Sequence, residues 1–277
     1  MNVLKATVEL TKASVRVLKE HPRLAAFPML MIGAIVVLGL VIAGLFQGNP
    51  KLIWLWILLA WFGISFLGVF FETALTGESL RALRGHRPSV RSGLGSAGRC
   101  LPAVLGYTFI TMTVGFLIVM IGRSSTVGVR LARRMVATAW SLVTFFALPV
   151  MVQEKRGGYD SVMRSGRIFS RTWGETTLAE VGLRAFLAHL SVVLVALLVW
   201  MIGFLGDSPL VIIAIFVTWS ALVGLLGALD SIYRSALYIF AVEGVVPTPF
   251  DTAELNAIWR VDSPGGDSTS DDPPTLD

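Results

Sequence analysis

Long apolar runs separated by short polar segments dominate the pattern of the chain. The six runs lie at 24–46, 52–75, 101–122, 135–152, 183–205 and 210–229, and the last continues as helical sequence to 242. About 20 apolar residues in a helix cross the ~30 Å hydrocarbon layer. In lipid, only helices and closed barrels give every backbone group a hydrogen-bond partner. These runs lack the alternation of barrel strands. The pattern predicts an all-α, polytopic membrane bundle of six transmembrane helices, in a single membrane domain at 1–260.

The composition agrees with this prediction and excludes an ordinary soluble domain. The 277 residues are 55% hydrophobic and 15% charged, with a mean hydropathy of +0.74. Soluble domains hold about 45–50% apolar and about 25% charged residues. Charge is scattered through the first 23 residues, and the first apolar run is longer than that of a signal peptide. We therefore expect no cleavable signal, and a first span that stays as an anchor.

The basic residues predict the orientation of the spans. Lys and Arg next to span ends stay on the cytoplasmic side, and with the N-terminus inside, 18 of the 23 fall there. The outside keeps Lys51, Arg123, Arg130, Arg133 and Arg134, so the expected outer loop before the fourth span fits this rule poorly. We expect a multi-pass protein of the cytoplasmic (inner) membrane with both termini in the cytoplasm.

Three basic segments on the cytoplasmic side, at 3–20, 89–100 and 159–173, have the periodicity of amphipathic helices. The last contains MRSGRIFSRTWGE, in which the arginines share one helical stripe opposite apolar and aromatic residues. Such helices next to spans lie in the membrane interface, with their cations toward anionic headgroups. The alternative is a solvated charged helix. The residues predicted to contact anionic lipid or a protein partner are Lys12, Arg16, Lys19, Arg91, Arg99, Arg164, Arg167, Arg171 and Trp173.

A short pattern recurs where predicted spans end. Residues 82–89 read ALRGHRPS and residues 241–248 read AVEGVVPT, while 154–158, EKRGG, is a looser version. The glycine suits a left-handed helix end, and the hydroxyl after proline suits the cap of the next helix. The pattern predicts three units of interfacial helix, span, outer turn, span and glycine turn. A short helix at 249–260 follows, and the acidic tail at 261–277 is predicted to be disordered.

Ionisable residues in or near the spans are candidates for function. They are Glu72, Glu154, Glu180, Arg184, His189, Asp230 and Arg234. Glu72 and Glu154 lie at cytoplasmic span ends, where pairing with arginine is the simpler interpretation. Two pairs place an acid four residues before a base, Glu180 with Arg184 and Asp230 with Arg234, so each pair can be neutralised within one helix. Asp230 lies either near the inner boundary or inside the bundle. His189 fits a buried structural histidine better than a proton relay.

Local motifs indicate no catalytic, metal or cofactor site. Residues 93–98 match G-x-G-x-x-G, but the dinucleotide fingerprint needs a preceding strand, and here a basic loop precedes and a span follows. The three histidines lie in different segments without metal-ligand spacing, and Cys100 is the only cysteine, so the chain cannot form an intrachain disulfide. An interfacial helix explains the arginine-rich segment, so we expect no nucleic-acid partner.

Three stretches resemble a known family. They are AWSLVTFFALPVMVQEK at 139–155, GGYDSVMRSGRIFSRTWGE at 157–175 and FFETALTGESLRALRGHRPSVRSGL at 70–94, which resemble uncharacterised prokaryotic six-span membrane proteins. The likeness covers the chain from about 70 to 260. More distantly, the chain is similar to the membrane domain attached to some glycerophosphodiester phosphodiesterases. The resemblance implies a six-span fold and a membrane location but no activity, and this chain has Glu72 where the family favours Asn.

These features favour a non-enzymatic membrane scaffold or accessory protein that engages anionic lipid or partner proteins through its basic helices. A second copy of the chain is a further form of protein partner. A small transporter or channel is the alternative, with a polar path built from Glu72, Glu154, Asp230 and His189 if these side chains converge. An intramembrane lipid-modifying enzyme is the third class, and it needs an acid, base or metal cluster that the sequence does not display.

Overall fold

The structure is a computed structural model that describes residues 3–48, 50–121, 126–173 and 209–250. Within these ranges the regular elements are all helices, as predicted. The predicted fifth span at 183–205, most of the short helix at 249–260 and the tail at 261–277 lie outside the described residues. The protein is therefore all-helical in its described part, and the count of six spans stays a prediction.

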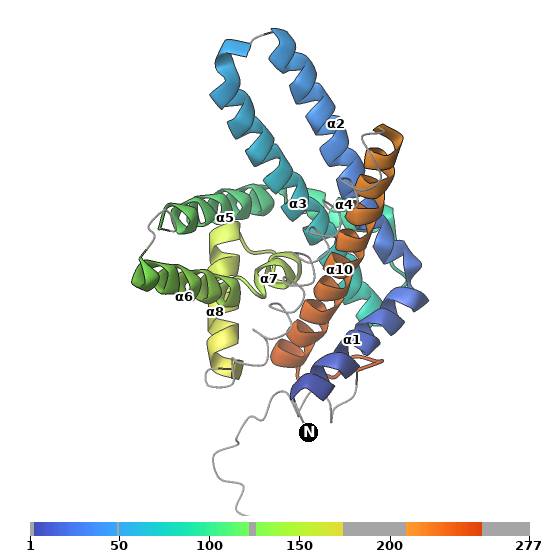
Figure 1. The fold of residues 1–277 in the computed structure, drawn as a ribbon. Helices are drawn as coiled ribbons and strands as arrows, with labels where there is room; N and C mark the ends of the chain where they lie inside the picture. The colour runs from blue at the N-terminus through green and yellow to red at the C-terminus, as the bar shows by residue number, and fades with distance from the viewer. Residues whose placement is uncertain (1–2, 49, 122–125, 174–208, 251–277) are drawn as a thin grey trace, which may run out of the picture.

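The described helices follow the chain in the order that Figure 1 shows. They are α1 (Val3–Glu20), η1 (Pro22–Ala25), α2 (Ala26–Gly48), η2 (Pro50–Leu52), α3 (Ile53–Leu83), α4 (Val90–Arg99), α5 (Leu101–Ile121), α6 (Val127–Val143), α7 (Ala147–Gln153), α8 (Gly158–Trp173) and α10 (Pro209–Glu243). The η elements are single turns of 3-10 helix. With 31 and 35 residues, α3 and α10 exceed the roughly 20 residues that a bilayer needs, so each extends past the hydrocarbon layer.

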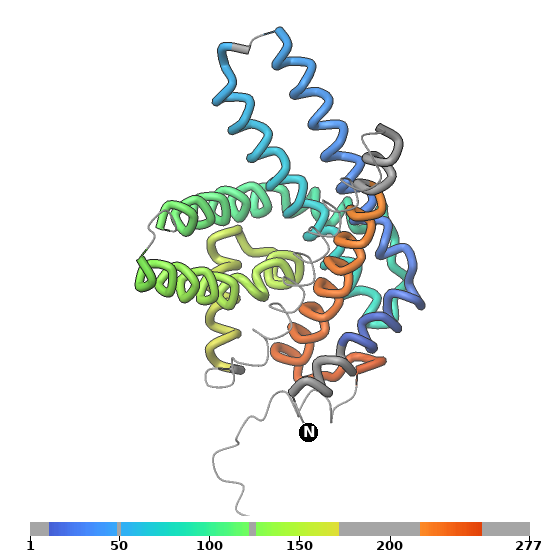
Figure 2. The backbone as a smooth tube through the Cα atoms, viewed as in Figure 1, coloured from blue at the N-terminus to red at the C-terminus, as the bar shows by residue number. Residues whose placement is uncertain are grey.

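Five helical segments are long and apolar enough to cross a membrane. They are Pro22–Gly48, Ile53–Leu83, Leu101–Ile121, Val127–Gln153 and Val217–Glu243. The end of α2 and the start of α3, on either side of their connecting turn, project from the other described helices (Figure 1 and Figure 2) and expose large apolar side chains such as Leu40, at 70%, and Trp54, at 80%. Soluble monomers rarely expose apolar surface of this extent. Lipid is the environment that fits this surface, so the chain is a membrane protein.

The fourth of these segments is broken at residues 144–146, between α6 and α7. Pro149 accounts for the break, because proline has no amide to bond the carbonyl four residues earlier. The backbone N of Phe146, which the break frees, donates to Oγ of Ser165 on α8 at 2.8 Å. The sequence predicts one continuous span at 135–152, and the structure differs from that prediction in this break.

The same segment also begins earlier than predicted. Residues 127–134, which the sequence assigns to an outer loop, form the first two turns of α6. Arg130, Arg133 and Arg134 lie exposed on this helix. These arginines interrupt the apolar run, so a search for apolar runs alone places the start of the span too late in the chain.

A buried core lies where the second halves of α3 and α10 meet α1, α4, α7 and α8. It includes Phe27, Leu80, Phe146 and Leu237, all almost fully buried. In Figure 2 this core lies at the base of the α2–α3 hairpin, and α10 runs beside α1. We call this region the hub: α1, α4, α7, α8 and the second halves of α3 and α10.

The three basic segments fold as α1, α4 and α8, but their apolar sides face the protein. Val17 of α1, Ala97 of α4 and Phe169 of α8 are 2%, 0% and 8% exposed, and all three belong to the core. The sequence predicts these sides in the acyl boundary of the membrane. The structure differs because α1 packs on α10, α4 on α3, and α8 mainly on α5 and α7, so that the same apolar area is buried against protein.

Three described residues have positive φ, and each follows a helix end. They are Gly85 after α3 (φ 78), Lys155 after α7 (φ 50) and Gly244 after α10 (φ 67). The predicted left-handed turns at the two glycines are confirmed, whereas the looser version at 154–158 places the left-handed residue at Lys155 instead of a glycine. The hydroxyl of Ser89 makes no capping bond. Its backbone N donates instead to Oε2 of Glu78 at 2.7 Å.

Candidate functional site

Glu72 of α3 and Asp230 of α10 share one cation, Arg234 of α10. The Nη2 of Arg234 lies 2.9 Å from Oε1 of Glu72 and also contacts Oδ2 of Asp230. The side chains of Asp230 and Arg234 are 16% and 19% exposed, and that of Glu72 is 38% exposed. The structure thus brings three of the predicted polar residues together and places Asp230 inside the bundle. We call these three residues the charge cluster.

Helical spacing and a polar contact between helices assemble the cluster. Asp230 and Arg234 are one turn apart, so they lie on the same face of α10. Beside them, the hydroxyls of Thr76 on α3 and Ser231 on α10 bond each other at 3.1 Å in a buried position. This contact fixes α3 against α10 at the level of the cluster, because each buried hydroxyl satisfies the other.

The cluster is short of positive charge and of hydrogen bonds. Two carboxylates and one guanidinium leave an excess of about one negative charge when all three groups are ionised. Oδ1 of Asp230 and Nε of Arg234 are buried and have no hydrogen-bond partner among the described residues. Excess charge in a low-dielectric environment is costly unless it is neutralised. The arrangement therefore suits a further positively charged group.

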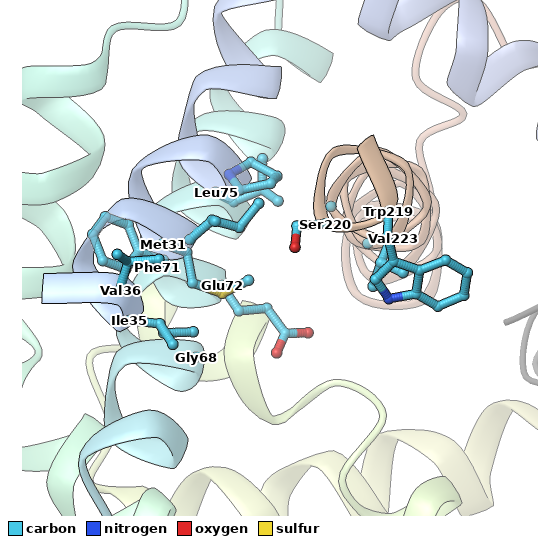
Figure 3. A pocket seen from close by; sticks show the side chains of 14 residues that line it. Met31, Ile35, Val36, Gly68, Phe71, Glu72, Leu75, Trp219, Ser220 and Val223 are labelled. Carbon is cyan, nitrogen blue, oxygen red and sulfur yellow. The ribbon is translucent and has the colours of Figure 1, made fainter. Parts of the chain in front are cut away.

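An apolar cleft of about 460 Å³ lies against the cluster, between α2, α3 and α10. Glu72 lines this cleft together with apolar side chains such as Met31, Phe71 and Val223. In Figure 3 the carboxylate of Glu72 and the hydroxyl of Ser220 lie in the open space between α3 and α10. The apolar cleft is thus a site for an apolar body with one polar end.

Glu154, which follows α7, forms a separate ion-pair group. Its Oε2 lies 2.7 Å from Nε of Arg156, and its Oε1 lies 3.1 Å from Nε of Arg164 on α8. The hydroxyl of Tyr238 on α10 donates to Oε1 at 3.3 Å. Burial opposes ionisation of Glu154, but the hydrogen bonds and charges of the two arginines outweigh it, so the pKa of Glu154 lies below its usual value.

Glu154→Gln is expected to lower the free energy of unfolding by about 1–2 kcal/mol at neutral pH, because hydrogen bonds between charged groups are lost. A lowered folded-state pKa means that the carboxylate stabilises the fold above its unfolded pKa. That contribution is lost as the pH falls through the folded pKa. The difference between the two proteins should therefore be full near neutrality and vanish in acid. Denaturant unfolding in detergent micelles over a pH series measures it, and a difference that does not change with pH contradicts this role.

The basic helices of the hub present most of their predicted cations on the outside. The exposed ones are Lys12, Arg16 and Lys19 on α1, Arg91 and Arg99 on α4, and Arg167 and Arg171 on α8. Arg164 differs, because it is half-buried and paired with Glu154. The side chain of Trp173 lies outside the described residues.

A second cleft, of about 380 Å³, lies between α4, the start of α5 and the turn after α7. Arg99, Lys155 and Arg156 line it together with Cys100, and we call it the basic cleft. Burial raises the pKa of the Cys100 thiol above its usual value, and the charges of Arg99 and Lys155 offset this only in part. The thiol is therefore protonated at neutral pH. The three cations suit an anionic group such as a lipid phosphate.

Glu78 and Tyr238 are two polar residues that the sequence analysis misses. Glu78 is fully buried on α3 and holds the turn before α4 through the backbone N of Ser89, and nothing in its spacing signals this. Tyr238 lies one helical turn beyond Arg234 and two beyond Asp230. Residues at that spacing share a helix face, so the spacing is a signal that identifies Tyr238.

The structure separates the residues of the predicted polar path. Glu72 and Asp230 meet in the charge cluster, while Glu154 belongs to a different ion-pair group. Glu180, Arg184 and His189 lie outside the described residues. In the part of the chain that the structure describes, no three His, Cys, Asp or Glu side chains lie close enough to hold a metal ion.

Comparisons with known proteins identify the family but add no activity. A model of a family of unknown function (DUF6159) matches residues 51–248, a range that contains the charge cluster and the basic cleft. No curated protein and no solved structure matches the chain. The more distant likeness to the membrane domain of glycerophosphodiester phosphodiesterases therefore stays a prediction. Because the family model covers more than half of the 277 residues, the chain belongs to this family of unknown function.

Proposed function

We propose that the protein is a non-enzymatic scaffold or accessory protein of the cytoplasmic membrane that binds anionic lipid headgroups through its hub. In this proposal six spans cross the membrane, both termini lie in the cytoplasm, and the hub lies at the inner surface. The distribution of Lys and Arg along the chain supports this orientation. The cytoplasmic leaflet carries the anionic lipids that attract basic segments.

The observation that carries the proposal is the division of each basic helix into a buried apolar side and an exposed basic side. On α1, Val17 is buried and Arg16 is exposed, and on α8, Phe169 is buried and Arg171 is exposed. The apolar sides already account for the packing of these helices on the hub, so their exposed cations are available for a ligand. The basic cleft adds a place where three cations meet one phosphate.

Removing exposed cations from the hub is expected to weaken a preference for anionic lipid. The variant carries Arg16→Gln, Lys19→Gln, Arg91→Gln and Arg167→Gln and is reconstituted in phosphatidylcholine vesicles. Spin-labelled phosphatidylglycerol and phosphatidylcholine give the relative association constant of the two lipids. One cation near the membrane surface contributes about 1 kcal/mol, or about fivefold. The wild type should therefore prefer phosphatidylglycerol by about fivefold or more, and the variant, which keeps the basic cleft and the other exposed cations, should lose most of that preference.

The matched control keeps the charge at the same four positions, with Arg16→Lys, Lys19→Arg, Arg91→Lys and Arg167→Lys. It should retain the preference, because the attraction between cation and phosphate does not depend on which basic residue supplies the charge. A wild type that binds both lipids equally, or a glutamine variant that keeps the preference, contradicts the proposal. In either case the exposed cations would serve an acidic protein surface instead.

The three-unit repeat forms part of the same proposal. The left-handed residues after α3, α7 and α10 support it. So does the ion pair between Arg84 and Glu243, which stand at corresponding positions just before Gly85 and Gly244. In this scheme each unit contributes one basic helix to the hub: α1, α4 and α8 in turn.

A small transporter or channel is the second candidate, because Glu72, Asp230 and Arg234 converge beside the apolar cleft. Tyr238 extends the polar stripe of α10 toward Glu154. A path along this stripe leads from the cleft to the hub. Ion flux into liposomes that Asp230→Asn leaves unchanged contradicts this candidate.

A further inference from the structure

The charge cluster lies in two segments that are apolar enough to cross a membrane, Ile53–Leu83 and Val217–Glu243. Its two carboxylates outnumber its one guanidinium. Ionisable groups at such positions are costly and need a neutralising partner. Oδ1 of Asp230 is buried and has no partner among the described residues, so the described side chains leave the cluster unsaturated.

The apolar cleft connects the excess charge to a space that a ligand is able to fill. Glu72 belongs both to the charge cluster and to the wall of the cleft. The α2 side of the cleft is apolar and consists of Pro28, Met31, Ile32, Ile35 and Val36. The volume of about 460 Å³ falls in the range of about 300–1,000 Å³ that is typical of small-molecule sites. A ligand that fits this cleft is apolar over most of its surface and positive at one point.

We propose that the apolar cleft binds a monovalent lipophilic cation, with Glu72 as the counter-ion. The cation neutralises the excess charge of the cluster, while its apolar body is buried against α2, α3 and α10. Bare Mg²⁺ or Ca²⁺ does not fit, because each requires six or more oxygen ligands and the lining is mostly apolar. This site does not depend on the exposed cations of the hub.

The test measures binding of tetraphenylphosphonium, a rigid lipophilic monocation, to the full-length protein. Equilibrium dialysis in neutral detergent, with protein-free micelles subtracted, gives the dissociation constant. Tetraphenylborate has the same shape and the opposite charge, and it should bind at least about tenfold more weakly. Glu72→Gln removes the excess charge and leaves the Asp230–Arg234 pair intact, so it should weaken binding of the cation by about tenfold.

Substitution of either of two glycines in the lining blocks the apolar cleft and leaves its charges unchanged. Gly68 and Gly227 line the cleft, and a Cβ at either position meets no atom within 4 Å. Gly68→Leu should fill the cleft and abolish binding, while its melting temperature stays close to that of the wild type. Gly227→Leu repeats the block from α10 if the first variant fails to fold.

The possible results separate this proposal from the one on lipid headgroups. Equal binding of the two tetraphenyl ions, unchanged binding in Glu72→Gln, or no binding by the wild type each overturns the cation site. The preference for phosphatidylglycerol, measured on the Gly68→Leu protein, should persist, because no lysine or arginine lines the apolar cleft that this substitution fills. A Gly68→Leu protein that binds the cation as the wild type does also overturns the proposal.

Discussion

Gly158→Ala is expected to lower the free energy of unfolding by about 3 kcal/mol. A Cβ at Gly158 would overlap the backbone N of Tyr107 and lie 2.6 Å from the carbonyl O of Ala103. Both are backbone atoms of α5, which cannot rotate away as a side chain does. The substitution therefore forces the first turn of α8 off α5. Denaturant unfolding in mixed micelles measures the loss, and a drop of several degrees in melting temperature accompanies it.

Gly157→Ala is the matched control, because it makes the same chemical change one residue earlier. A Cβ at Gly157 meets only Oδ2 of Asp160, at 3.6 Å, which is an ordinary contact. This variant should unfold within about 0.5 kcal/mol of the wild type. Equal stability of the two variants would mean that α8 does not rest on α5 through Gly158.

The sequence predicts the helical class and the approximate places of the long helices well, because both depend on local apolar runs. It fails at residues 144–146, where Pro149 breaks the fourth span while the apolar run continues across the break. It also fails for the first turns of α6, where Arg130, Arg133 and Arg134 interrupt the run. In both places helix geometry depends on backbone hydrogen bonds, which hydropathy does not report.

The direction of the apolar sides of α1, α4 and α8 shows a second limit. Helical periodicity identifies a buried stripe, and Val17 and Phe169 are indeed buried. Periodicity does not distinguish burial in lipid from burial against protein, since both remove apolar area from water. The deciding fact is the packing of α1 on α10, of α4 on α3 and of α8 on α5 and α7, which is a tertiary property.

The candidate site is also only partly readable from sequence. Asp230 and Arg234 are four residues apart, so their pairing follows from helix geometry. Glu72 is far from them in the chain, and only the packing of α3 on α10 brings it to Arg234. The apolar cleft has no sequence signal, because its lining residues are those of any span.

Arg234→Met is expected to lower the free energy of unfolding by about 3–5 kcal/mol at neutral pH, the largest effect that the structure predicts. Methionine has a similar length and packs well, so the main change is electrostatic. It leaves Glu72 and Asp230 as neighbouring carboxylates without a cation. Denaturant unfolding in micelles at neutral pH measures this loss.

The triple variant Glu72→Gln/Asp230→Asn/Arg234→Met tests whether charge is the cause. Replacing all members of a buried ion-pair group is often nearly neutral, whereas removing one member leaves a charge uncompensated. The triple variant should therefore regain most of the stability that Arg234→Met loses. Arg234→Lys should fall between the two, because one ammonium keeps the charge but lacks the planar fork that reaches both carboxylates. If the triple variant is no more stable than Arg234→Met, the arginine stabilises the fold through the packing of its stem, and α3 and α10 do not depend on the charge cluster.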